Sequence, residues 1–359
     1  MQYRITYFSF LLSLLVVILH CTSAISGYDD ANLSFRSNDM IWNIFHFFFV
    51  LILRPFCRLA VPAFFILSGY LFFRNYKLNK TLSKYKSRFR SLVLPYLLWN
   101  AISVCWIMCL YSIPHLRVFI VSDTPFEITN MIDGLLFYKY NYFWFVGILI
   151  VYVCAAPIFY CLLKNRLGGI IIVLSFFLFC FFVLSDIKYK YYYDPYSLVT
   201  YSIGSYLGIH FKNLTLIKLD WQSSKYSIAI LLCLLFINAI IQLCEVESFF
   251  YELYKCTFYV IAPLLLWPCL NMFYNGHKIK WYHHLSFFVY AIHIYIQKPL
   301  CGTVHTLFSR YMETVSFSEF IQYLIVIPVS IALCIAVAKF TNKYYPQTFR
   351  VLCGGRNYS

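Results

Sequence analysis

The chain has 359 residues, of which 62% are hydrophobic and only 12% are charged, and its mean hydropathy is +0.70. Soluble domains carry about 25% charged residues, so this composition excludes a soluble globular protein and predicts an all-α integral membrane protein. The formal net charge of +15 does not indicate a nucleic-acid ligand, because the basic residues are spread over short connecting segments. The 14 cysteines lack metal-ligand spacing, so we expect neither a metal site nor a permanently bound cofactor.

Apolar stretches long enough to cross a bilayer recur along the chain, and they predict about ten transmembrane helices. We expect these helices near residues 5–24, 56–73, 91–111, 143–163, 168–185, 195–211, 225–244, 254–274, 284–304 and 318–340. The apolar stretch 41–53 is too short to cross alone and is closed by Arg54-Pro55. It is therefore expected to be an interfacial or re-entrant lead into the second transmembrane helix.

The distribution of charge orients the predicted helices. If the N-terminus is cytoplasmic, the cytoplasmic connections contain most of the basic residues, among them the cluster from Arg74 to Arg90. Asp220 is then the only acidic residue on that side, and this asymmetry is the one that the positive-inside rule requires. We therefore predict that both termini are cytoplasmic, with a membrane domain at 1–345 and a short cytoplasmic tail at 346–359.

The first expected helix carries one narrow polar stripe. At about 100° per residue, five polar side chains lie within about 60° of one another: Gln2, Thr6, Ser9, Ser13 and His20. Polar side chains are costly in lipid, so this stripe is expected to face the bundle interior, either as a packing seam or as a functional site. With a rise of about 1.5 Å per residue, His20 lies roughly 22 Å from the start of the helix, in the outer half of the membrane.

Other expected helices carry similar polar faces. The ninth places Ser286, Tyr290, His293 and Gln297 on one face, and the third places Tyr96, Asn100 and Ser103 on one face with Trp99 beside them. A second intramembrane histidine favours a functional site over a packing seam. In the sixth helix, Gly204 and Gly208 have the spacing of close helix packing, and no chemistry is assigned to them.

Six ordered stretches connect these features to a known family. They are FSFLLSLLVVILHCTS, VPAFFILSGYLFFR, KSRFRSLVLPYLLWN, YFWFVGILIVYVCAAPIF, YSIGSYLG and LSFFVYAIHIYI. From residue 5 to about residue 340 the chain resembles the integral-membrane acyltransferases of acyltransferase family 3, which includes bacterial polysaccharide O-acetyltransferases. The resemblance implies an O-acyltransferase of the bacterial inner membrane. It would move an acyl group, usually acetyl from acetyl-CoA, to a hydroxyl of a sugar or of a cell-surface polysaccharide precursor.

The resemblance also implies roles for individual residues. His20 corresponds to the essential histidine of the family's first helix, and His293 matches a histidine often found in the ninth or tenth helix. Members commonly have an arginine eleven residues before the first histidine, where this chain has Ser9. Arg88 and Arg90 enter the third helix from the basic side and are the expected contacts for the phosphates of the acyl donor, although they also fit a simple positive-inside anchor.

A neutral imidazole can remove the proton of a hydroxyl near pH 7, so we expect His20 to be a general base, with an acyl-histidine intermediate as the open alternative. Asp29, Asp30 and Asp39 are candidate partners of His20, or solvated loop charges. The other candidates for catalysis or substrate binding are His293, Ser68, Tyr70, Trp144, Tyr96 and Asn100.

The expected partners are the lipid bilayer, a glycan or sugar acceptor and acyl-CoA, without nucleic acid, and the sequence does not indicate an oligomeric state. The alternative function is a non-enzymatic exporter or flippase of a lipid-linked glycan, which internal repeats would favour. We find no convincing repeat between 5–170 and 180–340. A glycan polymerase would need a larger outer loop than this chain offers.

Overall fold

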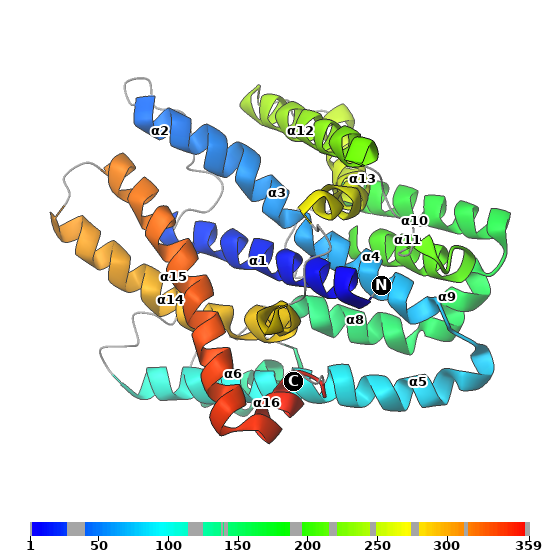
Figure 1. Cartoon of the computed structure of the whole chain (residues 1–359), viewed down its shortest axis with the longest axis horizontal. Coiled ribbons are helices and arrows are strands. Elements are labelled where there is room, and N and C mark those ends of the chain that lie inside the picture. Colours follow the sequence, from blue (N-terminus) through cyan, green and yellow to red (C-terminus); the bar gives the residue numbers. More distant parts are fainter. Residues whose placement is uncertain are drawn as a thin grey trace.

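The computed structural model describes residues 2–26, 40–113, 125–137, 139, 143–186, 196–214, 221–244, 249–273, 280–311 and 315–355. These residues form helices, and no strand occurs among them (Figure 1). The first half contains α1 (Gln2–Ser26), α2 (Met40–Phe45), η2 (His46–Leu53), α3 (Arg54–Arg58), α4 (Ala60–Phe73), η3 (Leu78–Lys80), α5 (Thr81–Arg88), η4 (Phe89–Val93), α6 (Leu94–Ser112), α7 (Ile128–Leu136), α8 (Trp144–Cys154) and α9 (Ala156–Leu163). The second half contains α10 (Arg166–Asp186), α11 (Tyr196–His210), α12 (Trp221–Leu243), α13 (Phe249–Phe273), η7 (Trp281–Leu285), α14 (Ser286–Tyr311), α15 (Val315–Tyr344) and α16 (Pro346–Leu352).

Each expected transmembrane helix coincides with a helix or with consecutive helical segments. Within the described ranges, six helices are long and apolar enough to cross a membrane, or seven if α8 and α9, which are bent by 65° at their junction, form one span. The chain is therefore an all-α membrane protein. α11 has only 15 residues, and α14 carries the polar stripe, which explains why these two are not among the six. The count of about ten and the cytoplasmic position of both termini stay predictions.

Two of the prolines that lie inside helical runs come just after a π-helix. Pro55 follows the π-helix η2, and Pro95 follows the π-helix η4. Proline lacks an N–H group and its ring clashes with the carbonyl of the preceding turn, and a wider π turn accommodates both defects. The candidate spans His46–Phe73 and Leu78–Ser112 therefore continue through the prolines. This differs from the expectation that Arg54-Pro55 closes the stretch 41–53.

Glycines bring α4 and α11 into close contact. A Cβ atom at Gly208 would lie 2.6 Å from the carbonyl oxygen of Tyr70, and one at Gly204 would overlap the backbone of Ile66. Gly69 makes the reciprocal approach, because its Cβ atom would lie 2.5 Å from the carbonyl oxygen of Tyr201. These contacts confirm that the small-residue spacing of the sixth expected helix serves close helix packing.

Helix α1 lies in the middle of the bundle (Figure 1), where it packs against α3, α4, α14 and α15. The hydrophobic core follows it on both sides, and Leu12, Val17 and Cys21 are fully buried. Polar side chains on α1 therefore face other helices, and α14 is the neighbour that meets them.

Candidate functional site

The two histidines singled out in the sequence lie side by side. The ring centroids of His20 on α1 and His293 on α14 are 5.2 Å apart, with an angle of 31° between the ring planes. His293 is buried and donates its Nδ1–H to the carbonyl oxygen of Tyr290, at 2.6 Å. That bond places the proton of a neutral ring on Nδ1 and leaves Nε2 as a lone-pair acceptor. Nε2 is buried without a hydrogen-bond partner among the described residues.

Hydrogen bonds between helices hold α1 and α14 together above and below this pair. The hydroxyl of Ser286 donates to the carbonyl oxygen of Ser9 at 2.8 Å. The amide of Gln297 donates to the carbonyl oxygen of Val17 at 2.7 Å and lies 2.9 Å from the sulfur of Cys21. Because these two α1 residues flank His20, Gln297 fixes the stretch of helix that carries this histidine.

A cavity of about 160 Å³, which we call the polar cavity after its six polar lining residues, lies along the same two helices, although ten apolar residues also line it. The polar side chains that line it are Ser9, Ser68, Arg88, Ser91, Ser286 and Tyr290. Arg88 is the only charged side chain among the described residues of its lining. Ser9 lies roughly 16 Å from His20 along α1. Tyr290, which also lines the cavity, has its ring centroid 6.1 Å from that of His293, so one end of the cavity lies close to the histidine pair.

The structure separates the two arginines proposed for donor binding. Arg88 lines the polar cavity, and its guanidinium carbon lies 5.6 Å from the ring centroid of Phe72. Lys84 donates to the carbonyl oxygen of Phe72 at 2.5 Å and so ties α5 to the end of α4. Arg90 is exposed and does not line this cavity. Of the two, only Arg88 is placed to meet a ligand there.

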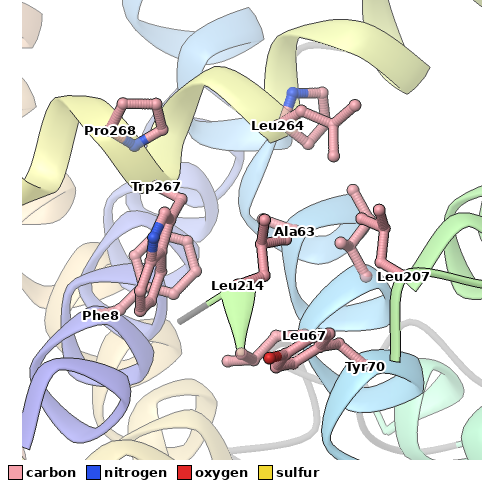
Figure 2. Close-up of a pocket in the computed structure, with 11 residues that line it drawn as sticks. Phe8, Ala63, Leu67, Tyr70, Leu207, Leu214, Leu264, Trp267 and Pro268 are labelled. Carbon is pink, nitrogen blue, oxygen red and sulfur yellow. The ribbon is translucent and has the colours of Figure 1, made fainter. Parts of the chain in front are cut away.

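A second cavity, of about 220 Å³, contains another predicted residue, Tyr70. Figure 2 shows side chains of α1, α4, α11 and α13 pointing into this space, among them Phe8, Leu207 and Trp267. The hydroxyl of Tyr70 donates to the carbonyl oxygen of Lys212 at 2.7 Å. The lining is therefore almost entirely apolar, and this cavity offers little for acyl-transfer chemistry. Leu67 lines both cavities and lies between them.

The remaining predicted residues that the structure describes contact neighbouring helices, and their roles stay predictions. Tyr96 and Asn100 donate to the carbonyl oxygens of Leu136 and Leu135, at 2.7 and 2.8 Å, and so hold the end of α7. Trp144 is partly buried, and its ring centroid lies 6.4 Å from that of Phe65. Asp29, Asp30 and Asp39, the candidate partners of His20, lie outside the described residues. Within the part of the chain that the structure covers, no His, Cys, Asp and Glu side chains are grouped to hold a metal ion.

Ser286 and Gln297 lie on the polar stripe that the sequence predicts for α14, but the sequence alone does not assign them a place in the site. Their role depends on α1 lying opposite. The sequence gives no reason to choose Ser91 as a site residue, because it lies in a basic stretch that is typical of a membrane anchor. Its position on the cavity wall follows only from the packing of η4.

The chain matches a known protein family over most of its length. A family model described as an acyltransferase domain, that of acyltransferase family 3, matches residues 3–339. The chain belongs to acyltransferase family 3. It is thus a membrane acyltransferase with several membrane helices, and the family match includes both histidines and the polar cavity. No curated protein and no solved structure matches the chain significantly.

Proposed function

We propose that this membrane acyltransferase moves an acetyl group from acetyl-CoA to a hydroxyl of a sugar or of a cell-surface polysaccharide precursor, at the bacterial inner membrane. The observation that carries the proposal is the pairing of His20 with His293 where two polar helix faces meet. In a membrane protein such groups are costly, and they mark functional sites by default.

The polar cavity is our candidate for the donor site. The phosphates of CoA carry several negative charges, and Arg88 offers a planar set of donors for charge-assisted hydrogen bonds to them. Ser9, Ser68 and Ser91 add hydroxyl groups to the same lining, whereas the hydroxyl of Ser286 already donates to the carbonyl oxygen of Ser9. From Arg88 the flexible arm of CoA would run past Tyr290, whose ring centroid lies 6.1 Å from that of His293, and its thioester would reach the histidine pair there.

In the proposed reaction His20 takes the proton of the acceptor hydroxyl, while the oxygen of that hydroxyl attacks the thioester carbonyl carbon. The new C–O bond forms, the C–S bond breaks, and the His20 imidazolium returns the proton to the CoA thiolate. Nε2 of His293 has a lone pair close to this imidazolium and stabilises its charge by accepting an N–H bond. This is the orienting role that the base of a catalytic pair requires.

Direct transfer and an acyl-histidine intermediate can be distinguished by whether the protein becomes covalently labelled in the absence of the acceptor. Incubation of the purified protein with labelled acetyl-CoA and no acceptor leaves label on the protein only if an acyl-enzyme forms. We assign direct transfer, because the paired histidines provide a base and its support in one place. Label found on a peptide that contains His20 would refute direct transfer and support an acyl-histidine intermediate.

The experiment that tests the function measures O-acetyl groups on the surface glycan by mass spectrometry, in a strain that lacks the gene. Complementation with the wild type should restore acetylation, and His20→Ala should not. His283→Ala is the matched control, because His283 also packs on α1, against Tyr7 and Phe10, but outside the site. Unchanged acetylation on deletion, together with reduced glycan export, would instead support the exporter. Full acetylation with His20→Ala would refute only the assignment of the base.

A further inference from the structure

The last described residues of the chain fold back onto the bundle. Helix α16 is followed by Cys353, Gly354 and Gly355, and both glycines have positive φ, 73° and 76°. We call residues 346–355 the C-terminal segment. It follows the residues that the family model matches and lies beside α6 (Figure 1).

Three contacts attach the C-terminal segment to the bundle. Phe349 is fully buried, and its ring centroid lies 4.9 Å from that of Phe288 on α14. The indole of Trp99 on α6 donates to the carbonyl oxygen of Leu352 at 3.1 Å. Gly354 lies so close to η4 that a Cβ atom there would collide with the carbonyl oxygen of Ser91.

Each of these contacts reaches an element of the proposed site. Ser91 lines the polar cavity and follows Arg88 by three residues. Phe288 stands on α14 between Ser286 and Tyr290, which also line that cavity, although Phe288 itself does not. The C-terminal segment therefore packs against two elements, η4 and α14, that contribute to the cavity lining.

Trp99 extends the connection toward the histidines. Its ring stacks on Tyr295, at 6.1 Å between centroids and 28° between planes, and Tyr295 is two residues from His293. The hydroxyls of Tyr295 and Ser103 are hydrogen-bonded, which fixes this side chain between α6 and α14. One short segment thus contacts two elements that line the cavity and, through Trp99, the helix that carries His293.

We propose that the C-terminal segment is a positioning element of the donor site, with Gly354 as the positioning residue that sets the place of η4. This inference rests on the proposed function of the polar cavity as the CoA site. Holding η4 against α14 keeps Arg88 and Ser91 at the separation that the phosphates of CoA require. The segment then acts on donor binding more than on the stability of the bundle.

The two adjacent glycines supply a matched pair of variants. Both have left-handed backbone, which asparagine adopts more readily than other side chains, so Gly354→Asn and Gly355→Asn introduce a similar backbone cost. No atom lies within 4 Å of a Cβ atom at Gly355, whereas at Gly354 the Ser91 backbone is in the way. Only Gly354→Asn therefore displaces η4.

The test is equilibrium binding of coenzyme A to the full chain in lipid nanodiscs, well below the unfolding temperature. We expect Gly354→Asn to raise Kd about tenfold, which corresponds to one charge-assisted hydrogen bond, and Gly355→Asn to change it less than about twofold. Trp99→Phe keeps an aromatic ring but loses the bond to Leu352. It should raise Kd several-fold, and it decides the question if Gly354→Asn does not fold.

The outcomes separate the two proposals. Wild-type protein that binds no coenzyme A overturns both the donor site and the positioning role. Wild-type binding with unchanged Kd in Gly354→Asn, or in Trp99→Phe where Gly354→Asn does not fold, overturns the positioning role alone. A lower unfolding temperature with unchanged Kd would show that the segment only stabilises the bundle.

Discussion

Gln297 gives the sharpest test of how the histidine pair is held. Its side-chain amide crosses from α14 to Val17 and Cys21 on α1, on both sides of His20. Gln297→Met has nearly the same length and removes both bonds. Without them, the part of α1 that carries His20 can shift relative to His293.

The effect on stability should be small. Hydrogen bonds between membrane helices contribute about 0.6 kcal/mol on average, so the loss of two costs roughly 1 kcal/mol. The oxygen Oε1 of Gln297 is buried and has no hydrogen-bond partner in the described structure, which itself costs about 1–3 kcal/mol. Methionine removes that penalty too, so the free energy of unfolding should change by less than about 2 kcal/mol.

The effect on catalysis should be large. A displacement of about 1 Å between reacting groups lowers a rate by about a hundredfold, so we expect kcat of Gln297→Met to fall ten- to a hundredfold. The assay is acetyl transfer to the surface glycan, combined with thermal unfolding of the purified protein. Gln322→Met is the control, because Gln322 on α15 is also buried with an Oε1 that lacks a partner. Equal losses of kcat in the two variants would refute the role of Gln297.

Two further predictions concern packing and donor binding. Gly204→Ala should lower the free energy of unfolding by about 1–3 kcal/mol, because its methyl group overlaps the backbone of Ile66. Gly168→Ala, where the nearest atom is 3.6 Å away, should leave thermal unfolding unchanged or raise its midpoint, and the reverse order would contradict the packing argument. Arg88→Gln should raise KM for acetyl-CoA ten- to a hundredfold, as loss of a charge-assisted bond of about 1.5–3 kcal/mol implies. Arg90→Gln should change KM less than about twofold, and equal effects would remove the cavity from donor binding.

Properties of single helices were predictable from the sequence. Apolar length indicates a membrane protein, and the angular position of polar residues identifies the stripes that carry His20 and His293. Both signals depend on local periodicity and on the cost of polar groups in lipid, and neither depends on the neighbours of a helix. The same reasoning explains why Gly204 and Gly208 could be assigned to close packing before their partner helix was known.

The sequence could not predict which polar groups meet. Tyr96 and Asn100 share a face with Ser103 and are predicted site residues. In the structure they donate to two carbonyls at the end of α7. A helical stripe shows that a polar group needs a partner inside the bundle, but it does not distinguish a backbone carbonyl from a substrate.

The amino-acid sequence is enough to identify a membrane protein with histidines on the inner faces of two helices, because apolar length and the spacing of polar residues are properties of each segment. That those two faces meet is visible only in the folded structure, since Gln297 and Cys21 are 276 residues apart in the chain. It also placed Arg88, but not Arg90, at a polar cavity, and seated Phe349 of the expected tail in the core. Contacts over such distances depend on how whole helix surfaces fit, and no local pattern encodes that fit.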